Sequence, residues 1–206
     1  MQQNAAGALG ILALDSQQNS DAIIAAGAVP SLVALLRSDQ PAVQEKAAGA
    51  LSMLAASSQQ NQIRIIAAGA VPPLVVLLTS DQSAVQEKAA GALSMLATNS
   101  QQNGDAIIAA GAVPFLIALV RSDQPTVQQQ AAGALWNLAR DCLQKQDAII
   151  AAGAVPLLIV LLRSDKAGVP KKSAVALKNL AFSSQQNGDA IIAAGGHQPP
   201  SIDKWP

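Results

Sequence analysis

A repeat of 42 residues runs through almost the whole chain and limits the folds that it can adopt. Residues 19–60 and 61–102 are identical at 33 of 42 positions, and no residue is inserted or lost between 1 and 195. The string AAGAVP begins at Ala25, Ala67, Ala109 and Ala151, and the string AAGAL begins at Ala5, Ala47, Ala89 and Ala131, with a degenerate copy at 173–177. A fixed period of this length is typical of proteins that stack one small structural unit.

Each unit is predicted to contain three helices, and the first two are predicted to meet at a glycine. In the unit 19–60, a short first helix covers 20–26 and ends before Gly27, a residue suited to the left-handed conformation just after a helix. The second helix is predicted from Pro30 to about Arg37, because proline fits a first helical turn, where its missing N–H has no helical partner.

The third helix of the unit is predicted to be the longest, over 41–56. The turn before it, 38–40, carries Ser38 and Asp39, which favour capping of the helix that follows. Apolar residues recur at helical spacing on one face of this helix, at Val43, Ala47, Ala50, Leu51 and Leu54. A polar loop over 57–61 is predicted to close the unit.

A single unit cannot bury its own apolar surface, because about forty residues make too small a core. Stacked units cover one another, so the chain is predicted to be an all-α protein, a right-handed α-solenoid with contacts between neighbouring units. One array is predicted over 1–195, followed by a non-repeat tail over 196–206. The array consists of a partial unit (1–18), four full units (19–60, 61–102, 103–144 and 145–186) and a partial unit (187–195).

The charge balance argues against nucleic-acid binding. The 13 basic and 13 acidic residues cancel, and aromatic residues make up 2% of the chain, so neither counterion release nor base stacking favours it. A weak basic bias appears late, at Lys166, Lys171, Lys172 and Lys178. These lysines indicate a solvated face or a docking patch for an acidic protein.

No catalytic, cofactor or metal site is predicted. His197, the single histidine, lies in the tail, too far from any repeated position to form a triad with Cys142, the single cysteine. No cluster of His or Cys offers three metal ligands, and neither GxGxxG nor a phosphate-binding loop is present. Cys142 stands where other units carry Ser16, Ser58 and Ser100, so it is interpreted as a drifted loop residue, with a reactive thiol as the alternative.

Two stretches of fifteen residues without a charge, 106–120 and 148–162, are not predicted to span a membrane. A spanning helix needs about 20 apolar residues, and each stretch is broken in the middle by a glycine and a proline. The N-terminus has no basic segment ahead of an apolar one, so no secretory signal is recognised. A cytoplasmic or nuclear location is expected.

The strings GAVPSLVALL, GAVPPLVVLL and GALWNLA, in units of 42 residues with three helices, resemble the armadillo repeat family over residues 1–195. HEAT repeats have a similar period but lack the Gly-Ala-Val-Pro corner. The GALWNLA copy is closer to β-catenin-like and plant-type armadillo domains than to importin-α. The resemblance implies an armadillo superhelix without catalytic activity, whose third helices line a concave groove that binds an extended peptide.

The groove residues that the resemblance implies depart from importin-α-like repeats at two positions. The position that holds Trp there holds Gly7, Gly49, Gly91, Gly133 and Val175 here, so the pockets for lysine side chains are missing. The position that holds Asn there holds Ile11, Met53, Met95, Asn137 and Asn179 here. This departure counts against a receptor for nuclear localisation signals, and a nuclear-import-type adaptor stays only as an alternative.

Helical geometry places Gly49 and Met53 on the same face as Lys46, within about 60° at 100° per residue. The predicted groove residues are Lys46, Gly49, Met53, Lys88, Gly91, Met95, Gln130, Gly133, Trp136, Asn137, Arg140, Lys172 and Asn179. We expect an extended, acidic and hydrophobic segment, since Met adapts to apolar side chains and Lys favours acidic ones. The glycines are expected to let the ligand backbone come close, and the amides of Asn137 and Asn179 to hold its second half.

These groove residues also have structural interpretations. Lys46 and Lys88 follow Glu45 and Glu87 and could serve only solubility, while the methionines could fill gaps between layers. Trp136 takes the place of small or polar residues in the other units, so it is interpreted either as a recognition hot spot or as a packing residue against a neighbouring third helix.

Both ends of the array look unfinished, because 1–18 form a third helix alone and the repeat stops after 195. Repeat arrays need polar caps, so we expect the ends to join copies into a homo-oligomer or to continue a longer array, with Ile202 and Trp205 as a partial cover. A second hypothesis is therefore a structural array that self-associates or builds a larger complex. A third is an engineered consensus scaffold, which the irregular last unit fits poorly.

Overall fold

A computed structural model gives the fold and describes residues 1–140, 143–166, 168–182 and 184–194. The described residues form fourteen α-helices and no strand. The first helices are α2 (Gln17–Ala25), α5 (Gln59–Ala67), α8 (Gln101–Ala109), α11 (Leu143–Ala151) and α14 (Gln185–Ala193). The second helices are α3 (Ala28–Leu35), α6 (Val71–Leu77), α9 (Ala112–Leu119) and α12 (Ala154–Leu161). The third helices are α1 (Gln2–Asp15), α4 (Pro41–Ser57), α7 (Ser83–Leu96), α10 (Pro125–Leu138) and α13 (Val169–Phe182). The predictions for Cys142, His197 and the tail lie outside the described residues.

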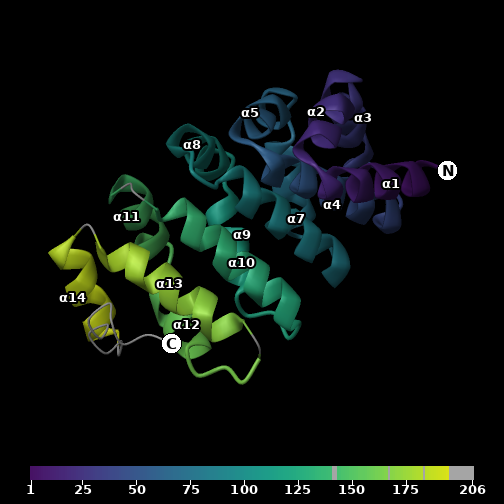
Figure 1. The fold of residues 1–206 in the computed structure, drawn as a ribbon. Coiled ribbons are helices and arrows are strands. Elements are labelled where there is room, and N and C mark those ends of the chain that lie inside the picture. The colour runs from purple at the N-terminus through teal and green to yellow at the C-terminus, as the bar shows by residue number, and fades with distance from the viewer. Residues whose placement is uncertain (141–142, 167, 183, 195–206) are drawn as a thin grey trace.

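The third helices stack side by side and form a continuous layer. α1 packs on α4, α4 on α7, α7 on α10, and α10 on α13. Figure 1 shows the first helices following one another along one edge of the molecule, from α2 to α14, with the third helices beside them. The predicted fold class, an all-α solenoid of three-helix units, is confirmed.

A left-handed glycine turns the chain between the first and second helices of each full unit, as predicted. Gly27, Gly69, Gly111 and Gly153 have φ angles from +78° to +83°. Residues with a Cβ are strained in this region, so the repeated glycine is needed for the turn. The axes bend by 87° between α8 and α9 and by 81° between α11 and α12.

Two predicted helix boundaries and one predicted helix cap are wrong. Residues 59–61 are the first turn of α5, because Ser58 caps this helix and its Oγ accepts the Asn61 N–H at 3.2 Å. The second helix starts at Ala28, directly after the glycine. Ser38 does not cap α4: its Oγ accepts the N–H of Gln40, the N-cap residue, at 3.1 Å, which shapes the turn before the helix.

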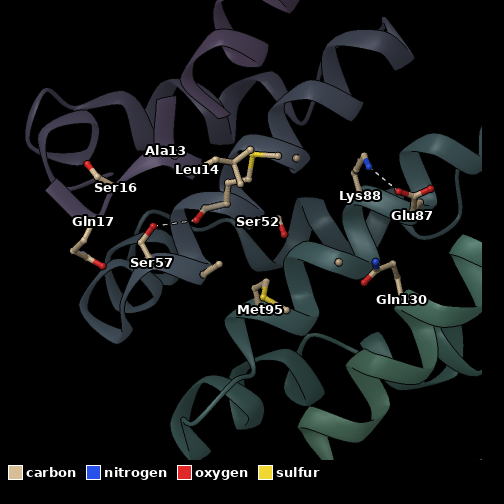
Figure 2. A pocket seen from close by; sticks show the side chains of 14 residues that line it. Ala13, Leu14, Ser16, Gln17, Ser52, Ser57, Glu87, Lys88, Met95 and Gln130 are labelled. Atoms are coloured by element: carbon tan, nitrogen blue, oxygen red, sulfur yellow. Dashed lines mark hydrogen bonds and ion pairs between the residues drawn. The ribbon is translucent and has the colours of Figure 1, made fainter. Parts of the chain in front are cut away.

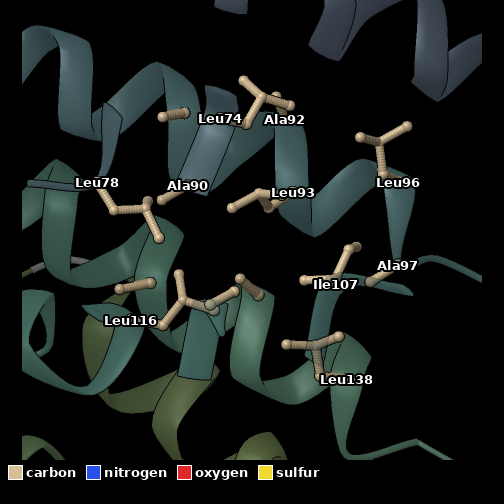
Figure 3. Packing of buried hydrophobic residues seen from close by; sticks show 14 of the residues in the cluster. Leu74, Leu78, Ala90, Ala92, Leu93, Leu96, Ala97, Ile107, Leu116 and Leu138 are labelled. Carbon is tan, nitrogen blue, oxygen red and sulfur yellow. The ribbon is translucent and has the colours of Figure 1, made fainter. Parts of the chain in front are cut away.

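The core lies between the helix layers and consists mainly of leucine and alanine (Figure 3). The predicted apolar face of α4 is confirmed, since all five of its residues are buried. Alanine at repeated positions such as Ala47 and Ala89, both 0% exposed, lets neighbouring third helices approach closely, because their side chains are short. Leucines such as Leu93 and Leu116 fill the space between layers.

Within the described part of the chain, a membrane-crossing length of apolar residues is not found in any single helix. The bent pairs α8 with α9 and α11 with α12 reach it together, by length and composition. No group of three or more His, Cys, Asp or Glu residues in that same part is placed to hold a metal ion.

Candidate functional site

A depression of about 500 Å³ opens on the face that successive third helices form. Its walls come from α1, α4, α7 and α10, and from the chain where α1 passes into α2 (Figure 2). Six of the thirteen predicted groove residues line it: Gly49, Met53, Lys88, Gly91, Met95 and Gln130. We call this depression, which also includes Leu14, the Met pocket. Lys46 and the predicted residues from Gly133 onward do not line it.

The glycines of this face receive the side chain of the following unit. A Cβ built on Gly49 would lie 3.9 Å from Lys88 Cδ, and one on Gly91 would lie 3.6 Å from Gln130 Oε1. The same step places Lys46 beside Gly7, at 3.8 Å, and Lys172 beside Gly133. A Lys or Gln of the following unit thus contacts each of these glycines. Gly49 and Gly91 still line the Met pocket, whereas Gly133 is buried and is not open to a ligand backbone.

Lys46 and Lys88 pair with the glutamates that precede them. Lys46 Nζ lies 2.9 Å from Glu45 Oε1, and Lys88 Nζ lies 2.6 Å from Glu87 Oε1. The two lysine side chains stay 43% and 41% exposed, so they can still meet a ligand. Burial raises the pKa of Glu87, but hydrogen bonds from Lys88 and Thr126 outweigh it and hold the pKa below its ordinary value.

The two methionines are half-buried and serve both the layer contacts and the pocket. A Cβ on Gly10 of α1 would lie 3.2 Å from Met53 Sδ, so Met53 fills space between α1 and α4. Met53 and Met95 pack against the core and also line the Met pocket. Leu14, which is 64% exposed, adds a third large apolar side chain to the same walls.

The side-chain amide of Asn137 is hydrogen-bonded to the preceding unit. Its Nδ2 donates to Ser94 O at 2.8 Å, and it also lies 3.1 Å from Ser94 Oγ and from Thr98 Oγ1. Asn179 Nδ2 donates to Trp136 O at 3.4 Å. The prediction that the N–H groups of these amides grip a ligand is therefore not supported, because they tie each third helix to the one before it.

Trp136 is half-buried and packs against the core of the solenoid. Lys172 Nζ lies 5.9 Å from the centroid of the indole ring, within the range of a cation–π contact. Arg140 donates from Nη2 to Asn99 Oδ1. These three predicted residues thus contact protein groups. Arg140 and Asn137 also line a second, smaller depression of about 230 Å³.

A buried lysine on α11 was missed by the sequence reasoning. Lys145 is 4% exposed, and its Nζ lies 2.5 Å from Gln101 O and 3.1 Å from Asp105 Oδ1. A Cβ on Gly104 would lie 2.7 Å from this Nζ, so Gly104 makes room for it. The repeat carried a signal for this site, since Lys145 replaces the asparagine found at 19, 61, 103 and 187.

The wall that α1 contributes to the Met pocket was also missed. Ala13 and Leu14 of α1 and Gln17 of α2 line it, and none of them is among the thirteen predicted groove residues. These residues precede or follow the end of α1, where the chain passes directly into α2. Ser16, a preferred helix-capping residue between the two helices, is the sequence feature that indicates this short connection. The predicted polar loop does not include it as a cap.

The chain matches a family model described as Armadillo/beta-catenin-like repeat in four stretches, 16–56, 58–98, 100–140 and 144–182. Three of these stretches begin at a serine that caps a first helix, Ser16, Ser58 or Ser100. No curated protein matches the chain.

Solved structures of engineered repeat proteins share the fold. One engineered protein superposes with a TM-score of 0.91 at 39% identity, covering 94% of this chain and 78% of that chain. A second gives a TM-score of 0.92 at 38% identity, covering 94% and 80%. A designed armadillo repeat protein in complex with the peptide (KR)4 gives a TM-score of 0.88 at 28% identity, covering 94% and 81%.

Proposed function

Because the chain belongs to the armadillo repeat family, we propose that it is a non-catalytic scaffold that binds an extended peptide along the face formed by its third helices. The Met pocket carries this proposal, since it is an open depression of about 500 Å³ to which four successive third helices contribute. Peptide binding by a designed armadillo relative adds support.

The lining of the Met pocket favours a large apolar side chain of the ligand. Leu14, Met53 and Met95 offer apolar surface from three different helices. Methionine adapts its shape to different apolar partners, so the pocket fits leucine, isoleucine, methionine or phenylalanine. Lys88 also lines the pocket, together with its partner Glu87; the lysine side chain is 41% exposed, and its remaining N–H groups favour an acidic ligand residue beside the apolar one.

The spacing of the layers sets the length of the ligand. Third helices packed about 10 Å apart span on the order of 40 Å from α1 to α13, and an extended peptide rises about 3.3 Å per residue. The face therefore accommodates roughly a dozen residues. The Met pocket holds the part of the ligand that lies against α1, α4 and α7.

The test uses three fluorescein-labelled peptides of about a dozen residues, followed by fluorescence anisotropy. All three carry two central leucines, and their flanks are Glu/Asp, Ser/Gly or Lys/Arg. The proposal predicts that the acidic peptide binds best. If none of the three binds the wild-type chain, the proposed function is wrong.

A matched pair of variants on α1 tests the pocket. Leu14 and Ile11 are both 64% exposed on this helix, but only Leu14 lines the Met pocket. Leu14→Glu is expected to weaken binding of the acidic peptide by about tenfold or more, whereas Ile11→Glu is expected to leave it nearly unchanged. Equal losses in both variants would contradict the site. Light scattering on the same proteins at several concentrations shows whether exposed Ile11 and Leu14 serve self-association instead.

A further inference from the structure

Lys172 has a different partner from Lys46 and Lys88, the lysines at the equivalent position of earlier units. Lys46 and Lys88 pair with glutamates, whereas Lys172 Nζ lies 5.9 Å from the centroid of the Trp136 ring. A Cβ on Gly133 would lie 3.3 Å from Lys172 Cδ and 3.0 Å from its Nζ. The aliphatic stem of Lys172 thus lies across Gly133, which directs the ammonium group to the ring.

The sequence around Lys172 explains this placement. The residue before it is Lys171, where the equivalent positions 45 and 87 hold glutamate. Among the described residues, no carboxylate forms an ion pair with Lys172. The electron-rich face of the indole is therefore the favourable contact within reach of this ammonium group.

The surface around this contact is cationic. Lys171 and Lys178 of the same helix are exposed. The equivalents of the groove glutamates on α10 and α13 are Gln129 and Lys171. A ligand cation that approaches the Trp136 ring meets the like charge of Lys172, whose Nζ lies 5.9 Å from the ring centroid.

We propose that Lys172 determines the charge specificity of this half of the peptide-binding face: its ammonium group receives an acidic ligand side chain, and its position over Trp136 keeps basic side chains off the ring. This inference rests on the proposed function, because it concerns a peptide lying along the third helices. It goes beyond that function by naming the residue that separates acidic from basic ligands.

The test compares two lysines that differ by one position. Lys172→Met keeps an unbranched side chain over Gly133 and Trp136 and removes the charge. Lys171→Met removes the same charge from an exposed neighbour that does not lie over the ring. The ratio of affinities for the acidic and basic peptides is expected to fall by about tenfold in Lys172→Met. In Lys171→Met it is expected to fall by about twofold, as for an exposed charge.

A double variant identifies the ring as the cause. The basic peptide is expected to bind Lys172→Met more tightly than wild type, because the ammonium group beside the indole no longer repels a ligand cation. Adding Trp136→Leu to Lys172→Met is expected to abolish this gain. Equivalent positions hold Gly10, Ser52, Ser94 and Lys178, so the fold accommodates other residues there, and circular dichroism verifies folding.

Equal changes of the affinity ratio in Lys171→Met and Lys172→Met would overturn the inference, since bulk charge would then suffice. A wild-type chain that binds all three peptides equally would overturn it too, while leaving peptide binding itself intact. A wild-type chain that binds none of the peptides would overturn the proposed function as well.

Discussion

The two halves of the third-helix face come from one repeat but present different surfaces. The half formed by α1, α4 and α7 is open at the Met pocket, where Met95 is half-buried and forms part of the wall. In the half formed by α10 and α13, Asn137 bonds back to α7, and Lys172 makes a cation–π contact with Trp136. The comparison teaches that a few substitutions at equivalent positions decide whether the face stays open or is occupied by the protein's own side chains.

The surface of one unit depends on the residues of the unit before it. Asn137 bonds to Ser94 on α7 and to Thr98 just after it, whereas the residues at the equivalent positions before Met95 are Ser52 and Ala56 of α4. A side chain that reaches across a layer contact must match a residue about one repeat earlier in sequence. Near-identical helices can therefore carry different surfaces.

The change Asn137→Met is expected to have the largest effect on stability, because it gives the second half the residue that the first half carries. It removes the hydrogen bonds to α7 and leaves the Ser94 carbonyl oxygen without this donor, so the free energy of unfolding should fall by about 1–3 kcal/mol. Urea denaturation followed by circular dichroism measures this loss. The opposite substitution at the equivalent position of α7, Met95→Asn, should add little to the free energy of unfolding, because Ala56 stands where the Thr98 hydroxyl would be needed as a partner. A loss below about 0.5 kcal/mol would mean that Asn137 does not tie the two helices together.

Substituting the equivalent glycines Gly49 and Gly133 compares the two halves of the face, with a smaller expected effect on stability. Gly49→Ala is expected to raise the free energy of unfolding by about 0.5–1 kcal/mol, because its Cβ makes an ordinary contact with Lys88. Gly133→Ala should raise the free energy of unfolding by less, because the new Cβ must push the Lys172 ammonium group away. Thermal unfolding measures both gains, and the fluorescence of Trp136, recorded with Trp205→Phe in every protein, should change only in Gly133→Ala. Equal gains with unchanged fluorescence would argue against the close packing of Lys172.

The acid response of Glu87 is expected to be the smallest effect and belongs to the first half, since the equivalent residue on α10 is Gln129. The pKa of Glu87 is lowered in the folded chain, so its stabilisation is present above the unfolded pKa and is lost as pH falls through the folded pKa. Glu87→Gln should lower stability by less than about 1 kcal/mol at neutral pH. Thermal unfolding between pH 7 and pH 3 should show this difference shrinking toward zero on the acid side. A constant offset over the whole range would show that the carboxylate charge is not its source.

Much of the fold follows from repeated residues with local causes. The glycine at position 27 and its equivalents predicted the corner between first and second helices, and the buried face of α4 was predicted from helical spacing. The predicted start of the first helix is wrong, because the polar stretch around Ser58 fits a loop as well as a helix start, and serine is also a preferred helix cap. Both possibilities fit the local sequence, and only the backbone geometry distinguishes them.

Less of the site could be predicted. Helical geometry predicts that Lys46, Gly49 and Met53 share one face of the third helix. It does not predict which side chains of the next unit contact the glycines. The buried position of Lys145 depends on Gly104 in the preceding unit, and the contact between Lys172 and Trp136 crosses from α13 to α10. Each of these contacts joins residues 36 to 41 positions apart, so neither helix alone indicates it.

The sequence by itself determined the unit, its three helices, the solenoid and the family, because the period, the glycines and the apolar spacing act within one unit or repeat unchanged from one to the next. Only the tertiary structure decided which groove residues stay open and which are occupied. The physical reason is that a polar or charged side chain takes the best partner within its reach, and stacking places that partner on the neighbouring unit.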